Sequence, residues 1–148
     1  MRSIVGEIVN NSEGVTVMDM EASIEHMSRG TVKHADVMLV VLEPYYRSLE
    51  TAGRIVPLAR GLGIQRIYGI ANKIRSPQDA EAVEAYCRNH DLQLIAKIPF
   101  DDNVVEADRT GRAVIDYDVN SPIVEELSRT VDFLLREVRV NGNGAGGN

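Results

Sequence analysis

Short apolar segments alternate with longer segments of helical pattern along most of this sequence. Residues 37–42 (VMLVVL) form an unbroken apolar run, which is typical of a strand covered on both faces. Segments 15–20, 64–72 and 92–98 have a similar character, and each is separated from the next by enough residues for a helix. Strands joined by helical crossovers run parallel in one sheet. The pattern therefore predicts a three-layer α/β fold, with a mostly parallel sheet and helices on both faces.

Capping signals and apolar spacing predict where the helices lie. Ser76-Pro77 and Ser121-Pro122 each place a cap residue before a proline in the first helical turn. Pro57 falls inside another helical pattern, where we expect a kink or a boundary. Gly111 is expected to stop a short helix. The expected helices span residues 1–9, 24–34, 46–61, 76–89, 104–109 and 121–138.

The bulk properties limit the possible classes of protein. A chain of 148 residues suits one domain, which we place at residues 1–139, followed by a disordered tail at 140–148 (VNGNGAGGN). A net charge of −6 argues against non-specific nucleic-acid binding. No apolar run approaches the roughly 20 residues that span a bilayer, so no membrane role is expected.

The single cysteine, Cys87, excludes an internal disulfide and a Cys-x-x-Cys metal site. It lies within a helical pattern and is expected to be a small buried apolar group. A reducing, cytoplasmic location fits this cysteine usage best.

Asp19 follows the apolar segment 15–18, at the expected end of a strand. In open parallel sheets the ligand crevice lies beyond the carboxyl ends of the strands, and a carboxylate there can hold an Mg²⁺-bound water beside a nucleotide. The alternative is a solvated aspartate in a loop. Nearby, Glu21, Glu25 and His26 could suggest a metal site, but a solvated acidic face is the favoured interpretation.

Polar and turn-forming residues also follow the next strands. Asn72-Lys73 ends the segment 64–72, and Pro99-Phe100-Asp101 follows the segment 92–98. An asparagine offers both a donor and an acceptor, which suits the edge of a purine base, and the Pro99–Asp101 turn could form the opposite wall. Taken singly, the asparagine is better explained by a turn at the strand end, and the second segment by a proline that stops a strand. Together they predict a nucleotide pocket at successive strand ends.

Residues 19–31 (DMEASIEHMSRGT) resemble the switch II region of the CooC-type ATPases, the accessory proteins for nickel insertion into carbon monoxide dehydrogenase. That family is part of the MinD/ParA group of deviant-Walker P-loop ATPases. The resemblance covers about residues 1–138. Further matching segments follow in the family's order at residues 40–44 (VVLEP), 69–73 (GIANK), 98–101 (IPFD) and 107–111 (ADRTG).

This resemblance implies ATP or ADP with Mg²⁺ as ligands. Asp19 would be the Walker B carboxylate, acting on the ion through water, and Glu21 would respond to the nucleotide state in the catalytic region. Asn72, Lys73 and the Pro99–Asp101 turn would contact adenine. It also implies a homodimer that closes across the nucleotide face, and a client metalloenzyme similar to carbon monoxide dehydrogenase.

The chain departs from the family pattern in several places. The lysine-bearing phosphate loop, the switch I aspartate and the nickel-binding Cys-x-Cys pair are not among these residues, and Ser23 replaces a usual glycine. We therefore expect the C-terminal portion of a P-loop NTPase-like protein, truncated at the N-terminus, that does not hydrolyse ATP alone, because the phosphate loop supplies most of the charge stabilisation.

In the family the phosphate-loop strand lies between the Walker B strand and the strand that matches residues 37–42. Without that strand two apolar edges would be left open. We expect segments 15–20 and 37–42 to pair directly, or another chain to fill the gap.

Other functions stay open at this stage. A non-catalytic interaction module derived from the same fold is the main alternative to a metallocentre-assembly ATPase. A partitioning or positioning ATPase is less favoured, because no C-terminal amphipathic membrane helix is evident and the net charge gives no support for DNA binding.

Overall fold

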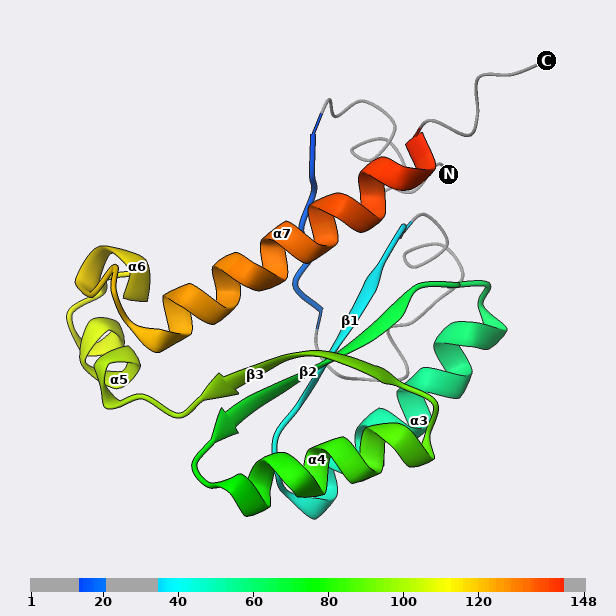
Figure 1. Cartoon of the computed structure of the whole chain (residues 1–148), viewed down its shortest axis with the longest axis horizontal. Helices are drawn as coiled ribbons and strands as arrows, with labels where there is room; N and C mark the ends of the chain where they lie inside the picture. The colour runs from blue at the N-terminus through cyan, green and yellow to red at the C-terminus, as the bar shows by residue number, and fades with distance from the viewer. Residues whose placement is uncertain (1–13, 21–34, 143–148) are drawn as a thin grey trace.

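A computed structural model describes residues 14–20 and 35–142. Its centre is a three-stranded parallel sheet in the order β1-β2-β3 (Figure 1). The strands are β1 (Met38–Leu42), β2 (Ile67–Ile74) and β3 (Gln93–Pro99). All three expected strands from residue 37 onward are therefore confirmed, with β2 ending two residues later than expected.

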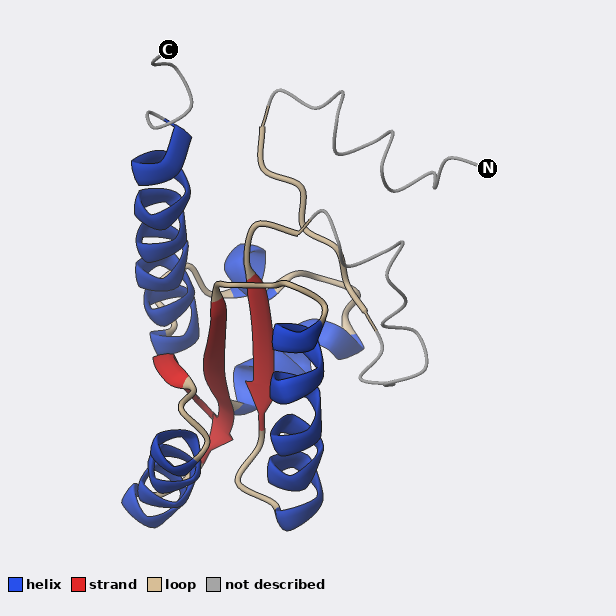
Figure 2. Cartoon of the chain, turned by 90° about the vertical axis from the view of Figure 1, so that its right-hand side faces the viewer, coloured by secondary structure: helices blue, strands red, loops and turns tan. Residues whose placement is uncertain are grey.

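Helices cover both faces of this sheet. The helices α3 (Tyr46–Gly61) and α4 (Pro77–Asn89) lie on one face, and α7 (Pro122–Gly142) lies on the other. Figure 2 shows the sheet edge-on between these two layers. Two short helices, α5 (Asp102–Arg109) and α6 (Val114–Tyr117), connect β3 to α7. The three-layer parallel α/β fold is confirmed, whereas α6 was not expected from the sequence.

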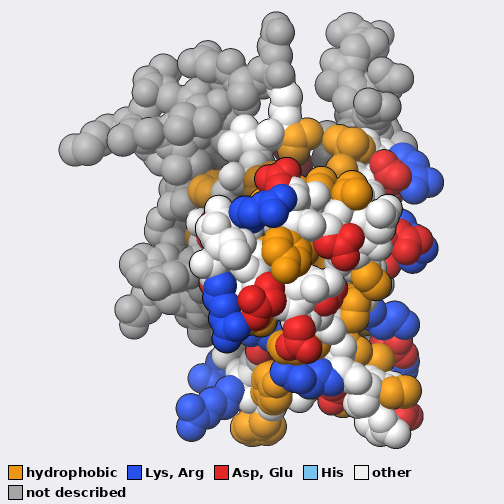
Figure 3. Space-filling model, turned by 90° about the vertical axis from the view of Figure 1, so that its left-hand side faces the viewer, with side chains coloured by type: hydrophobic (Ala, Val, Ile, Leu, Met, Phe, Trp, Pro, Cys, Tyr) orange, Lys and Arg blue, Asp and Glu red, His pale blue; other side chains and the backbone are white. Residues whose placement is uncertain are grey.

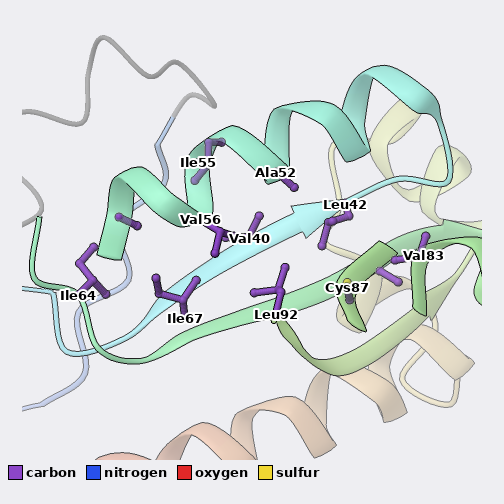
Figure 4. Close-up of a cluster of buried hydrophobic side chains, with 12 residues drawn as sticks. Val40, Leu42, Ala52, Ile55, Val56, Ile64, Ile67, Val83, Cys87 and Leu92 are labelled. Atoms are coloured by element: carbon purple, nitrogen blue, oxygen red, sulfur yellow. The ribbon is translucent and has the colours of Figure 1, made fainter. Parts of the chain in front are cut away.

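The main core lies between the sheet and the helices α3 and α4 (Figure 4). Inward-facing residues of β1 and β2 meet one stripe of each helix there, and Cys87 is buried among them as expected. Burial raises the pKa of the Cys87 thiol. The side chains drawn in Figure 4 include Val40, Leu42, Ala52, Ile55, Val56, Ile64, Ile67, Val83, Cys87 and Leu92.

The second helical layer is tied to β2 through Tyr68. Its ring packs edge-on against Phe133 of α7 with 5.2 Å between the centroids, and its hydroxyl donates a 2.7 Å hydrogen bond to Glu137. The Arg66 guanidinium donates to the Glu137 carbonyl oxygen at 3.0 Å. The hydrogen bond to the Glu137 carboxylate, with burial, raises the pKa of Tyr68. These contacts fix α7 across the face opposite α3 and α4.

Local capping positions the helices as the sequence indicated. Ser76 accepts a hydrogen bond from the Asp79 amide at 3.1 Å, and Ser121 accepts one from the Ile123 amide at 3.2 Å. Gly111, with a φ of 66°, follows the end of α5, where glycine adopts the left-handed region without strain. The helix α3 continues past Pro57 to Gly61, so of the two expectations for Pro57 the boundary is wrong, and the kink stays a prediction.

The expected buried strand at residues 15–20 is also wrong. Residues 15–20 are irregular, with Val15 67% and Val17 89% exposed. Among the described residues, β1 pairs only with β2, so direct pairing between 15–20 and 37–42 is not formed. An apolar segment is stable as a β-strand mainly when a neighbouring strand pairs with it and another layer covers it. Of residues 14–20, only Met20 packs against the core.

Three other expectations concern the ends of the chain and its second segment. The helices expected at 1–9 and 24–34 lie outside the described residues. The last helix extends to Gly142, beyond the expected end at 138. A disordered tail was expected from residue 140, but residues 140–142 belong to the helix α7. Residues 143–148 lie outside the described part.

Candidate functional site

The carboxyl end of β2 carries a bulge at Asn72 and Lys73. The register pairs Ala71 with Lys97 and then Ile74 with Pro99, so two residues of β2 oppose a single residue of β3. Lys73 has a φ of 58°, which is uncommon for a residue other than glycine, and its amide donates to the Asn72 side-chain oxygen at 3.0 Å. Bulges of this kind turn side chains away from the regular pleat, often beside binding sites.

Lys73 links the ends of β1 and β2. Its ammonium group lies 2.6 Å from a carboxylate oxygen of Glu43, the residue after β1, and both side chains are partly exposed. The Glu43 amide in turn donates to the Ser48 hydroxyl at 2.9 Å, in the first turn of α3. The bulge is therefore joined to the strand and helix beside it.

Arg75 and Phe100 join the ends of β2 and β3. The Phe100 amide donates to the Ile74 carbonyl oxygen at 2.9 Å, which continues the sheet one step beyond the Ile74–Pro99 pair. The guanidinium carbon of Arg75 lies 3.4 Å from the centre of the Phe100 ring. This cation–π contact puts a planar cation on an aromatic ring at the carboxyl edge of the sheet.

The Asp101 carboxylate is engaged in holding the framework. One of its oxygens accepts from the Asn103 amide at 2.9 Å, which caps α5. The other accepts from the hydroxyl of Ser121 at 3.0 Å, and Ser121 is fully buried at the start of α7. Asp101 thus fixes the turn after Pro99, and its contact with a base stays a prediction.

Asn72, Lys73, Pro99, Phe100 and Asp101 thus gather at one edge of the sheet, as the order of the motifs predicted. The arrows of β2 and β3 point toward this edge in Figure 1, and Figure 3 views the molecule from that side. Acidic and basic side chains are interspersed there with apolar ones.

Asp19 is not placed at the end of a strand, because residues 14–20 are irregular, and its side chain is exposed. Glu21 lies outside the described residues. Within 14–20 and 35–142, no group of three or more His, Cys, Asp or Glu side chains could hold a metal ion. Asp19 alone would supply at most one of the near-octahedral oxygen ligands of Mg²⁺, and water and phosphate oxygens would have to supply the others.

Sequence reasoning missed Glu43 and Arg75 as members of this edge. Both lie within three residues of a strand end or of Asn72, and that proximity was the available signal. Their partners, Lys73 and Phe100, are 30 and 25 residues away along the chain, so only the folded structure identifies the pairs.

A cavity of about 350 Å³ lies elsewhere, along the outer edge of β3 between α4 and α7. Its charged groups already have partners: Lys97 lies 2.8 Å from Glu84, and the Lys97 amide donates to Glu126 at 3.0 Å. The hydrogen bond from Lys97 lowers the pKa of Glu84. This arrangement protects an open strand edge, and the charged groups that line the cavity are all paired.

Comparison with known proteins agrees with this architecture. The chain is 40% identical to the carbon monoxide dehydrogenase accessory protein CooC of Rhodospirillum rubrum over 138 residues, which are 93% of the chain and 51% of CooC. It is 29% identical, over 92% of its length, to an uncharacterized ATP-binding protein of Methanocaldococcus jannaschii, of which it covers 52%. The chain is a relative of CooC.

The solved structure of the MinD cell division protein of Aquifex aeolicus superposes with a TM-score of 0.65 and 23% identity, over 76% of this chain and 49% of MinD. At this identity the match concerns the fold alone, which is that of the MinD/ParA P-loop ATPases. No protein-family model matches the chain. The chain spans about half the length of the curated relatives it matches.

Among the described residues, no helix is long and apolar enough to cross a membrane.

Proposed function

We propose that this CooC relative forms the base-recognition part of an ATP-dependent switch protein, with the adenine of ATP or ADP bound at the carboxyl ends of β2 and β3. The observation that carries the proposal is the bulge at Asn72 and Lys73, which faces the turn Pro99–Asp101 across the β2–β3 pair. This edge is where parallel α/β sheets bind ligands.

Asn72 has the central role in this proposal. Its side-chain oxygen already accepts from the Lys73 amide, which fixes the orientation of the amide group and leaves its NH₂ group directed elsewhere. That group can donate to a ring nitrogen of the base, and the second lone pair of the oxygen can accept from the exocyclic amine. Phe100 and Pro99 supply the apolar wall for the flat ring.

Titration of a fluorescent ATP analogue into the purified chain tests this site. We expect Asn72→Ala to raise the dissociation constant about tenfold, because one or two net hydrogen bonds are lost at about 1 kcal/mol each. Asn89→Ala is the matched control, since Asn89 is exposed at the far end of α4. Equal weakening by both substitutions, or no binding by the unmodified chain at millimolar nucleotide, would contradict the proposal.

The chain alone is not expected to hydrolyse ATP, since none of its 148 residues forms a lysine-bearing phosphate loop. Loss of one such group commonly reduces rates by orders of magnitude. In the whole switch protein, Asp19 would act on Mg²⁺ through water and Glu21 would respond to the nucleotide state. Turnover above a buffer control that disappears in Asp19→Ala would contradict the expected inactivity.

We also propose that the whole protein works in the cytoplasm as a homodimer and serves a client similar to carbon monoxide dehydrogenase. The name of the 40%-identical relative supports this client. Nickel handling is not assigned to this chain's residues, because the single cysteine, Cys87, is buried in the core. Co-purification of the full-length protein with such an enzyme, compared between ATP and ADP, tests the partnership.

A second candidate is a non-catalytic interaction module. It is favoured by one observation, the irregular and exposed state of residues 14–19, which leaves Asp19 outside the sheet. Under this alternative, nucleotide changes neither the stability of the chain nor its partner binding. A thermal melt with and without 5 mM ATP, a concentration chosen to exceed a dissociation constant of about 1 mM, separates the two candidates.

A further inference from the structure

Arg75 lies flat on Phe100. Its guanidinium carbon is 3.4 Å from the centre of the ring. At this distance a guanidinium standing upright would push one of its nitrogens into the ring, so the two planes are close to parallel. Phe100 is half-buried, whereas Arg75 is exposed. One face of the guanidinium is therefore covered by the aromatic ring, and the other is open to solvent.

The backbone on both sides of this stack is held in place. The Arg75 amide donates to an Asp79 carboxylate oxygen at 3.0 Å, and Asp79 belongs to the capped first turn of α4. The Phe100 amide is bonded to Ile74 of β2. Planar groups held on rigid elements are suited to positioning a ligand.

Within residues 14–20 and 35–142, the Arg75 guanidinium forms no ion pair. No carboxylate of the described residues lies within salt-bridge distance of it, although arginines 60, 88, 109 and 129 each have such a partner. Its stack on Phe100 lies three residues beyond Asn72, on the same strand end. A planar cation with one open face thus lies at the same strand end as the amide that we assign to the base edge.

We propose that Arg75 determines base specificity by stacking its open face on the purine ring of the nucleotide, with Phe100 as the layer beneath. This inference rests on the proposed function. Guanidinium groups stack on flat aromatic rings through dispersion and cation–π attraction, and they are weakly hydrated compared with ammonium groups. A purine has a larger flat surface than a pyrimidine, so stacking on the guanidinium should stabilise a bound purine more.

A simpler role for Arg75 is attraction of the phosphates by charge. The two roles differ in what lysine can replace, because lysine keeps the charge but lacks the planar group. A charge role predicts that Arg75→Lys binds nucleotide like the unmodified chain. A stacking role predicts that Arg75→Lys is nearly as impaired as Arg75→Ala.

The experiment measures competition of ATP, CTP and base-free tripolyphosphate against a fluorescent ATP analogue. We expect Arg75→Lys and Arg75→Ala to raise the dissociation constant for ATP about tenfold, which matches the free energy of stacking one base. The effect on CTP should be smaller, and tripolyphosphate should be unchanged in Arg75→Lys. Arg88→Lys is the control, since Arg88 is exposed at the far end of α4. Circular dichroism checks that each variant is folded.

The outcomes separate this inference from the proposed function. If the unmodified chain binds ATP and Arg75→Lys binds it equally well, the stacking role is overturned and base binding by Asn72 stands. If the ATP preference over CTP is unchanged in Arg75→Ala, the specificity role is likewise overturned. If the unmodified chain binds no nucleotide, the proposed function and this inference fail together.

Should Arg75→Ala prove unfolded, the Lys variant and Phe100→Leu keep the test decisive. Leucine preserves apolar volume beneath Arg75 but removes the flat ring, so we expect a loss of ATP affinity smaller than that of Arg75→Lys. Unchanged affinity in both folded variants would overturn the inference.

Discussion

Residues 14–20 and strand β2 have similar apolar character, yet they differ in structure. Residues 67–71 of β2 are buried without exception, because β1 and β3 flank the strand and helical layers cover both its faces. In the other segment, Val17 is 89% exposed. Apolar character alone is thus insufficient to make a strand, since hydrogen-bonding neighbours and a covering layer must also be present.

The same difference bears on function. At the end of β2, flanking strands fix the positions of Asn72 and Lys73 through the bulge and its contacts. Asp19 follows an apolar segment in the same way, but no strand of the described residues pairs with that segment. The proposed base site therefore has a built framework in this chain, whereas Asp19, the carboxylate proposed to act on Mg²⁺, does not lie at a paired strand end.

The largest expected effect is the difference in stability between two truncations, one in β2 and one in residues 14–20. Ile70 of β2 is 7% exposed, so we expect Ile70→Ala to lower the free energy of unfolding by about 2–5 kcal/mol, through lost burial and the cavity left behind. Val17→Ala should change it by less than about 0.5 kcal/mol. Urea denaturation followed by circular dichroism measures both. A loss above 1 kcal/mol in Val17→Ala, a threshold of about twice that surface range, would show that residues 14–20 are packed in solution.

A smaller effect concerns how β2 is covered by α7. Tyr68→Phe removes the 2.7 Å hydrogen bond to Glu137 but keeps the ring on Phe133. We expect a loss of about 1.5 kcal/mol, typical of a hydrogen bond to a charged group. Chemical denaturation at pH 7 measures it, and Tyr45→Phe is the control because Tyr45 is exposed. Equal stability of Tyr68→Phe and the unmodified chain would mean that this contact does not hold α7.

The pH dependence of Tyr68 offers an independent check. The folded-state pKa of Tyr68 is raised above 10.0, so the native state holds this proton more tightly than the unfolded state. The associated stability is fully present below pH 10, near the ordinary tyrosine pKa, and is lost as the pH rises through the raised pKa. Tyr68→Phe should lack this component, so the difference between the two proteins should shrink above pH 10. A constant difference across that range would contradict the assignment.

Most of the fold could be predicted because its signals are local. The apolar run at 37–42 and the cap-plus-proline starts at Ser76 and Ser121 each act within a few residues. The end of β2 was placed too early because Asn72 suggests a turn, whereas the bulge lets the strand resume and pair Ile74 with Pro99. Arg75 was missed because its partner Phe100 belongs to another strand end.

The smallest expected effect isolates the backbone of the bulge. Lys73 has a φ of 58°, a conformation that costs residues with a Cβ about 1 kcal/mol and glycine almost nothing. Lys73→Gly and Lys73→Ala both lose the partly exposed ion pair with Glu43, so their difference reports the backbone alone. We expect Lys73→Gly to be the more stable variant by about 1 kcal/mol.

The matched pair at Lys97 should show the opposite order. Lys97 of β3 is paired with Ala71 of β2, and it is not among the residues with positive φ. In an ordinary strand glycine is less stable than alanine by about 0.5–1 kcal/mol, because it loses more conformational freedom on folding. If Gly and Ala rank the same way at both positions, the bulge is not formed in solution, and the framework that distinguishes the end of β2 from residues 14–20 is lost with it.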